Sequence, residues 1–191
     1  MFIDYLTIML INLVAGLFLL GYYVYRGIDD PDQRRWAPGF LIVGIIGIAT
    51  GLHMTLTWPL PGANNIAFGE TELLFGVLFL AASLALAFNW SLFSISVFAI
   101  FAGFVAIEVG ARIIQKGLTQ EPIVAGVGFI LTGLTGLLLA PVLYWLKARP
   151  YRLIFAIIAI IAAAIWAFIG YGAYWSHFDS FAQWAPATLR K

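Results

Sequence analysis

Six long apolar stretches, separated by short polar or Pro- and Gly-rich breaks, dominate the hydrophobic pattern of this 191-residue chain. An α-helix needs roughly twenty residues to cross a bilayer, and each stretch is of this length. A crossing segment must bond its own backbone polar groups, which favours helices. The pattern therefore predicts an all-α, polytopic integral membrane bundle of about six transmembrane helices. The spans are expected at residues 5–25, 39–57, 71–88, 92–114, 123–146 and 153–174.

Composition makes the lipid bilayer the main solvent of this chain. Hydrophobic residues form 63% of the sequence and charged residues 10%, and the mean hydropathy is +0.98. Soluble proteins contain about 45–50% apolar and about 25% charged residues. Because six spans and short loops use up the length, we expect residues 1–191 to form a single transmembrane domain.

Net charge and cysteine content exclude several function classes. The formal net charge is +1, without the Lys and Arg excess of a phosphate-binding surface, so we expect no nucleic-acid partner. The sequence has no cysteine, which removes disulfides, thiolate metal sites and cysteine nucleophiles. It also has no phosphate-binding loop motif and no nucleophile-elbow serine. A metal site would therefore need His, Asp or Glu ligands.

Basic residues in the connections indicate an orientation. The first and fifth connections contain Arg26, Arg34, Arg35, Lys147, Arg149 and Arg152. The opposite side has only Arg112, Lys116, Arg190 and Lys191. Because short cytoplasmic loops are enriched in Lys and Arg, we predict that both termini lie on the outer face of the cell membrane.

The C-terminal segment carries aromatic side chains at helical spacing. Trp175, Phe178, Phe181 and Trp184 fall on one face of a helix over residues 175–185. Aromatic faces of this kind lie in the membrane–water interface. We therefore predict an interfacial C-terminal helix that anchors the bundle.

Glycines recur at helix-packing intervals in two spans. The second span contains Gly44, Gly47 and Gly51, and the fifth contains Gly126, Gly133 and Gly136. Small residues allow helix backbones to approach closely in lipid. The two spans are therefore expected to pack centrally.

Strict alternation of the spans brings ionisable residues to one membrane face. His53 lies at the end of the second span, Glu72 at the start of the third, and Glu108 and Arg112 toward the end of the fourth. Secondary candidates at the same face are Asp4, Glu70, His177 and Asp179. A charge inside hydrocarbon costs about 2.5–3.5 kcal/mol on insertion scales, so such residues usually face a bundle interior or wet cavity. We predict that His53, Glu72, Glu108 and Arg112 form a polar pocket near the outer face.

Purely structural interpretations compete with this functional one. Glu108 and Arg112 are spaced i and i+4, which suits an ion pair that only orients its helix, whereas the functional alternative is that Arg112 binds an anionic group. His53 can relay a proton or ligate a metal, or simply bond a neighbouring helix. Glu70 suits a helix start, and His177 suits titration at the interface.

One metal hypothesis follows from these residue types. His53, Glu72 and Glu108 supply one nitrogen and two carboxylates, which is sufficient for a divalent metal with an open position. The set lacks the tight local spacing of an HExxH motif. A bis-histidine haem would need both His53 and His177 at one iron, an arrangement that we do not expect.

Four stretches give the chain a family resemblance. They are MFIDYLTIMLINLVAG, YYVYRGIDDPDQRRWAPGF, GLHMTLTWPLPGANNIAFGE and GARIIQKGLT. They resemble a family of small prokaryotic multi-pass membrane proteins known only as a domain of unknown function, and the likeness covers nearly the whole chain. The resemblance implies a prokaryotic membrane protein of the same architecture. It implies no activity, cofactor or catalytic residue.

Three functional hypotheses remain open from the sequence. The leading one is a protein that binds or translocates a small cation or proton through the polar pocket. The second is an enzyme with a metal-assisted or quinone-linked site, in which Glu72 or Glu108 acts as general base. The third is an accessory subunit, packed against membrane-protein partners or further copies of itself, whose polar groups satisfy one another.

Overall fold

The computed structural model of the chain describes residues 5–182 and residue 184. Asp4, one of the secondary site candidates, lies outside the described residues, as does the end of the predicted interfacial helix. The described residues contain helices and connections and no strand.

Six helices in the described part of the chain are long and apolar enough to cross a membrane. Their main parts are α1 (Leu6–Tyr25), α2 (Ala37–Thr57), α3 (Thr71–Ala87), α4 (Phe93–Lys116), α5 (Pro122–Ala140) and α6 (Arg149–Ser180). Short 3₁₀ segments, η1 (Gly27–Asp29) and η2 (Gln33–Trp36), lie in the first connection, and π-helical segments η3 (Asn65–Glu70) and η4 (Pro141–Trp145) precede α3 and follow α5. The predicted all-α bundle of six membrane-spanning helices is confirmed.

Proline and positive-φ residues mark the helix ends. Pro38, Pro122 and Pro150 stand in the first turns of α2, α5 and α6, where the missing N–H breaks no helical bond. Gly117 ends α4 with φ +62°, the left-handed conformation that glycine adopts without steric cost. These residues keep the connections short and make the helices alternate in direction.

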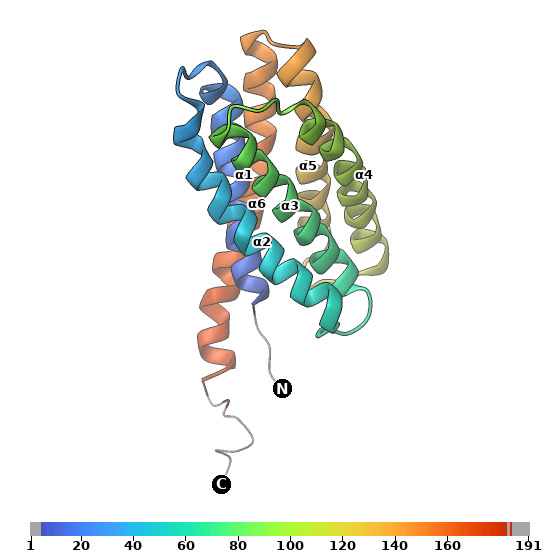
Figure 1. Ribbon diagram of the computed structural model, residues 1–191. Coiled ribbons are helices and arrows are strands. Elements are labelled where there is room, and N and C mark those ends of the chain that lie inside the picture. Colours follow the sequence, from blue (N-terminus) through green and yellow to red (C-terminus); the bar gives the residue numbers. More distant parts are fainter. Residues whose placement is uncertain (1–4, 183, 185–191) are drawn as a thin grey trace.

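The six helices form a ring in chain order, which α6 closes by packing against α1 (Figure 1). The closest packing joins α4 to α5, α2 to α3 and α1 to α6, whereas α1–α2 and α3–α4 contact each other less. At one end of the bundle α1 and α3 begin and α2 and α6 end (Figure 1). We call this the terminal end, and it is the end toward which the sequence places the ionisable candidates.

Glycines allow the closest of these contacts. A Cβ added at Gly103 of α4 would lie 2.5 Å from the carbonyl oxygen of Gly133 in α5, and one at Gly47 of α2 would lie 2.8 Å from the Cα of Gly76 in α3. The glycine faces of α2 and α5 therefore pack against α3 and α4. The expectation that α2 and α5 are the central helices is wrong, because α1 is the most buried described span, at 56% against 33% and 39%.

Helix α6 differs from its predicted extent. It continues through Ser180 without a break, so residues 175–180 of the expected interfacial helix are the end of α6 itself, whereas residues 181, 182 and 184 are not helical. No proline interrupts the sequence between Tyr174 and Ser180, and the helical hydrogen bonds simply continue. Trp175 and Phe178 on this extension are 82% and 81% exposed.

We predict that Gly103→Val destabilises the protein strongly. The new side chain would collide with the α5 backbone, and overpacking of this kind costs about 1–3 kcal/mol. Thermal unfolding in detergent measures the effect. The matched control is Gly172→Val, because an added Cβ at Gly172 meets no atom within 4 Å. Equal melting temperatures for the two variants would contradict backbone-to-backbone packing of α4 and α5.

Candidate functional site

A cavity of about 110 Å³ lies inside the ring, and all six helices contribute to its wall. This volume has room for several water molecules or one small solute. The wall is almost wholly apolar, with polar side chains at Thr71, Glu72, Thr132 and Thr135. A polar solute in this cavity therefore has few groups to bond.

Glu72 is the acidic residue of this wall, and its side chain is buried, with only 3% exposed. Asn12 of α1 donates from Nδ2 to Glu72 Oε1 over 2.9 Å and to the carbonyl oxygen of Val43 over 3.0 Å. Gly47 of α2 leaves room for the carboxyl group, because a Cβ there would lie 3.3 Å from Oε1. The carboxyl is thus held by α1 and accommodated by α2.

The second carboxyl oxygen, Glu72 Oε2, is buried and has no hydrogen-bond partner among the described residues. The ion pairs within residues 5–182 and 184 join Arg35 to Asp30 and Arg152 to Asp29, at the opposite end of the bundle. Within the described part of the chain, no cation therefore offsets the burial of Glu72. An ionisable group buried without a charge partner is costly, and inside a membrane it is by default a candidate functional residue.

The threonines of the wall are satisfied by the protein itself. Thr132 Oγ1 donates to the carbonyl oxygen of Gly128 over 2.8 Å and accepts from Trp166 Nε1 over 3.0 Å. Thr135 donates to the carbonyl oxygen of Thr132, and Thr71 to that of Ala67. Among the described residues of the wall, Glu72 Oε2 is therefore the buried side-chain polar atom without a partner in the protein.

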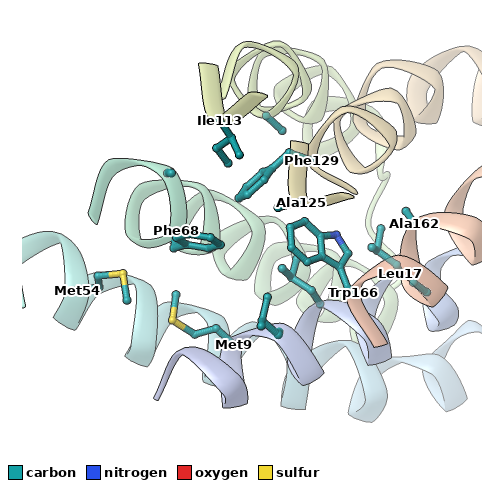
Figure 2. Packing of buried hydrophobic residues seen from close by; sticks show 14 residues of the cluster. Met9, Leu17, Met54, Phe68, Ile113, Ala125, Phe129, Ala162 and Trp166 are labelled. Atoms are coloured by element: carbon teal, nitrogen blue, oxygen red, sulfur yellow. The ribbon is translucent and has the colours of Figure 1, made fainter. Parts of the chain in front are cut away.

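Two aromatic groups flank Glu72 along the bundle. Toward the terminal end, Phe68 and Trp166 both pack on Phe129, at ring-centroid distances of 5.6 and 5.0 Å (Figure 2). Toward the opposite end, Phe79 packs against Phe75 and Phe40, at 4.4 and 5.2 Å. We call these the terminal aromatic group (Phe68, Phe129 and Trp166) and the opposite aromatic group (Phe40, Phe75 and Phe79).

Helix geometry explains why Glu72 lies between these groups. Phe68, Glu72, Phe75 and Phe79 follow one another at spacings of four, three and four residues, so they share one face. All four residues line the cavity. The face of η3 and α3 therefore presents an aromatic ring, an acid and two more rings along the cavity wall.

A buried asparagine fixes the approach to this face. Asn65 is fully buried; its Oδ1 accepts from the backbone N–H of Leu60 over 2.9 Å, and its Nδ2 donates to the carbonyl oxygens of Leu60 and Gly62. These bonds hold the α2–α3 connection against the first turn of η3, which carries Phe68. π-Helical segments occur frequently at functional sites.

His53 does not reach the cavity wall. It lies exposed near the end of α2, where its Nδ1 is 3.0 Å from the Tyr5 hydroxyl and 3.4 Å from Thr57 Oγ1. The Tyr5 and His53 rings meet edge to face, 5.3 Å apart. His53 therefore contacts the start of α1 and does not contact Glu72.

Glu108 and Arg112 are exposed on α4 and lie outside the cavity wall. They form no ion pair within 4 Å, and Arg112 Nη1 instead donates to Gln115 Oε1 over 2.6 Å. The buried face of α4 packs on α5 through Gly103 and Gly110, which turns the side of Glu108 outward. Of the four residues predicted to form one polar pocket, Glu72 alone lines the cavity.

The predicted metal triad is not assembled. Residues 5–182 and 184 contain no group of three His, Cys, Asp or Glu side chains placed to hold a metal ion. The physical reason is that Glu72 points into the ring whereas Glu108 points out of it. Of the secondary candidates, Glu70 and Asp179 are exposed, and His177 borders a shallow cavity between the start of α1 and the end of α6.

Asn12 is the site residue that sequence reasoning missed. It is 4% exposed and supplies the hydrogen bond that holds Glu72. Its signal is a lone amide in the middle of the first apolar stretch, where a polar side chain needs a partner inside the bundle.

Comparison with protein families identifies the chain. Residues 1–180 match the family described as "Protein of unknown function (DUF981)", and the chain belongs to this family. The predicted membership of an uncharacterised family is confirmed. No curated protein sequence matches the chain.

Comparison with solved structures gives a likeness of fold. The crystal structure of the urea channel from the human gastric pathogen Helicobacter pylori superposes with a TM-score of 0.69. The two chains are 17% identical, and the match covers 90% of this chain and 98% of the channel chain. At this identity the likeness concerns the helical membrane fold.

We predict that Asn12→Ala lowers stability measurably. The change leaves Glu72 Oε1 buried without its donor, at a cost of about 1–3 kcal/mol for the unsatisfied group, and it also removes the bond to the Val43 carbonyl oxygen. Melting temperature in detergent is the measurement. Asn64→Ala is the control, because Asn64 makes its side-chain bond to Pro61 at an exposed site. A variant pair that melts at the same temperature would show that Asn12 does not hold the site together.

Proposed function

We propose that this member of the DUF981 family is a membrane channel or transporter that moves a small solute through the central cavity past Glu72. The observation that carries the proposal is the unpartnered Glu72 Oε2, buried in the wall of a cavity lined by all six helices. An acid inside a membrane bundle is a functional residue by default. The fold likeness to the urea channel of Helicobacter pylori supports transport over the enzymatic and accessory roles.

The cavity favours a neutral solute that forms hydrogen bonds. A bound Ca²⁺ takes six to eight oxygen ligands and Mg²⁺ an octahedral set, whereas the described wall offers one carboxyl group and three threonine hydroxyls that already bond the protein. A small amide-like molecule needs a single strong polar partner and tolerates apolar contact elsewhere. Urea, which the related structure's name gives as its solute, belongs to this class. The proposed substrate class therefore differs from the small cation or proton predicted from the sequence.

The flanking aromatic groups support the same choice. The terminal and opposite aromatic groups place apolar rings on both sides of Glu72 along α3. Hydrophobic constrictions oppose the passage of water and hydrated ions. A neutral solute leaves its water at a lower cost than an ion does.

The orientation with both termini outside remains a prediction from the basic residues of the connections.

We predict that proteoliposomes containing the protein take up urea-sized amides faster than empty liposomes, and that Glu72 governs the rate. Glu72→Leu removes the polar partner of the solute, and losing one hydrogen bond of about 1.4 kcal/mol slows passage about tenfold. Glu72→Gln keeps a hydrogen-bonding group beside the cavity, so uptake should fall only a few-fold. Stopped-flow light scattering measures the rates.

The control for this experiment is Glu121→Gln, an exposed acid in the connection between α4 and α5. Its uptake should equal that of the unmodified protein. Solute uptake that is indistinguishable from empty liposomes, or a Glu72→Leu rate equal to the Glu121→Gln rate, would refute passage of a neutral amide past Glu72.

Proton movement is the second candidate, because Glu72 is a protonatable group between two apolar barriers. Here we predict a different pattern: Glu72→Gln stops acidification as completely as Glu72→Leu, since an amide cannot release a proton. A pH-sensitive dye trapped in proteoliposomes under an imposed pH gradient records the flux. Equal proton flux in the Gln variant and the unmodified protein would rule this candidate out.

A further inference from the structure

Helix α4 is the least buried span of the described chain, with 28% of its apolar window buried. The side facing away from α5 exposes Phe101, Phe104, Val105, Glu108, Ala111, Arg112 and Gln115. These residues follow one another at intervals of three, one, three, three, one and three, so they form one continuous stripe. We call this stripe the α4 outer face.

The position of Glu108 makes this face unusual for a surface in contact with lipid. Glu108 stands eight residues before Lys116, the last residue of α4, which is about 12 Å along the helix axis. The helix is 24 residues long, or about 36 Å, against about 30 Å for the hydrocarbon core. Glu108 therefore lies well inside the hydrocarbon, where an exposed acid is costly unless something covers it.

Nothing in the described part of the same chain offsets this charge. Glu108 forms no hydrogen bond or ion pair with a described residue, and the Arg112 guanidinium is drawn along the helix toward Gln115. That single bond leaves most of the guanidinium donors of Arg112 without a protein partner. The face thus presents one acid and one base, a helical turn apart, that do not pair within the chain.

We propose that the α4 outer face binds a second copy of this chain in the same membrane orientation. A two-fold axis along the membrane normal brings the same stripe from both copies together, so residue i contacts residue j and j contacts i. Glu108 of each copy then faces Arg112 of the other, and two ion pairs form. The stripe is complementary to itself in charge, whereas lipid tails supply no partner to either residue.

The aromatic part of the stripe suits this occupant. Phe101 and Phe104 are 66% and 58% exposed and lie nearer the middle of α4, along the helix axis, than Glu108. Between two copies they would bury large apolar area beside the ion pairs and shield these from lipid. The cavity lies on the inner side of the ring, so association through the α4 outer face does not cover the Glu72 site of either copy.

Thiol crosslinking tests the proposal, because the chain has no cysteine of its own. Ala111→Cys places a single thiol on the α4 outer face, and Ala164→Cys places one at an exposed position of α6. In liposomes treated with a short bismaleimide, we expect a dimer from Ala111→Cys at protein-to-lipid ratios where Ala164→Cys stays monomeric. Equal crosslinking of the two variants would show that the crosslinks arise from random collision, and it would overturn the proposal.

Charge exchange in the Ala111→Cys background tests the ion pairs. Glu108→Arg alone, and Arg112→Glu alone, bring like charges together and should lower the apparent association constant at least about tenfold. The double exchange should restore it. Unchanged association in both single variants would overturn the proposal and leave lipid or a different membrane protein as the partner of this face. The milder Glu108→Gln serves the same comparison if the charge-reversed chains do not fold.

Discussion

The hydrocarbon core of a bilayer offers no hydrogen bonds, and this constraint determines most of the structure. It confines the backbone to helices whose bonds are internal, and it moves proline and positive-φ glycine to the helix ends. It also removes the hydrophobic attraction between helices, so close van der Waals contact at glycines such as Gly103 and Gly133 has to hold the ring together. Against this background, each polar side chain away from a helix end needs a partner or a function.

The same constraint explains how far the sequence was informative. Length and alternation predicted the six spans and the depth of each ionisable residue, because both depend only on position along the chain. Rotation about the helix axis could not be predicted. In a soluble protein the polar side of a helix faces water, but in α4 the buried side and most of the outward side are both apolar. Glu72 and Glu108 therefore looked equivalent, although one lines the cavity and the other leaves the ring.

The sequence also did not indicate which neighbouring helix each helix packs against. The glycines of α2 and α5 correctly marked close helix contacts, but spacing within one helix does not say which neighbour fills the groove. The structure pairs them with α3 and α4. Asn12 shows the reverse case: one amide in an apolar stretch has no pattern around it, and its role depends on Glu72, which is sixty residues away. Long-range hydrogen bonds of this kind follow from the assembled ring alone.

The ring also indicates where it can change shape. Its tight contacts define three helix pairs, α1–α6, α2–α3 and α4–α5, and the looser junctions lie at α1–α2 and α3–α4. Glycine-to-backbone contacts such as Gly47 on Gly76 resist sliding, because any shift produces overlap. Cavity residues of α3 and α4 face each other across one loose junction. If the ring opens at the α3–α4 junction, Phe129 of α5 separates from Phe68 of η3, whereas the Asn12–Glu72 bond, between α1 and α3, is preserved.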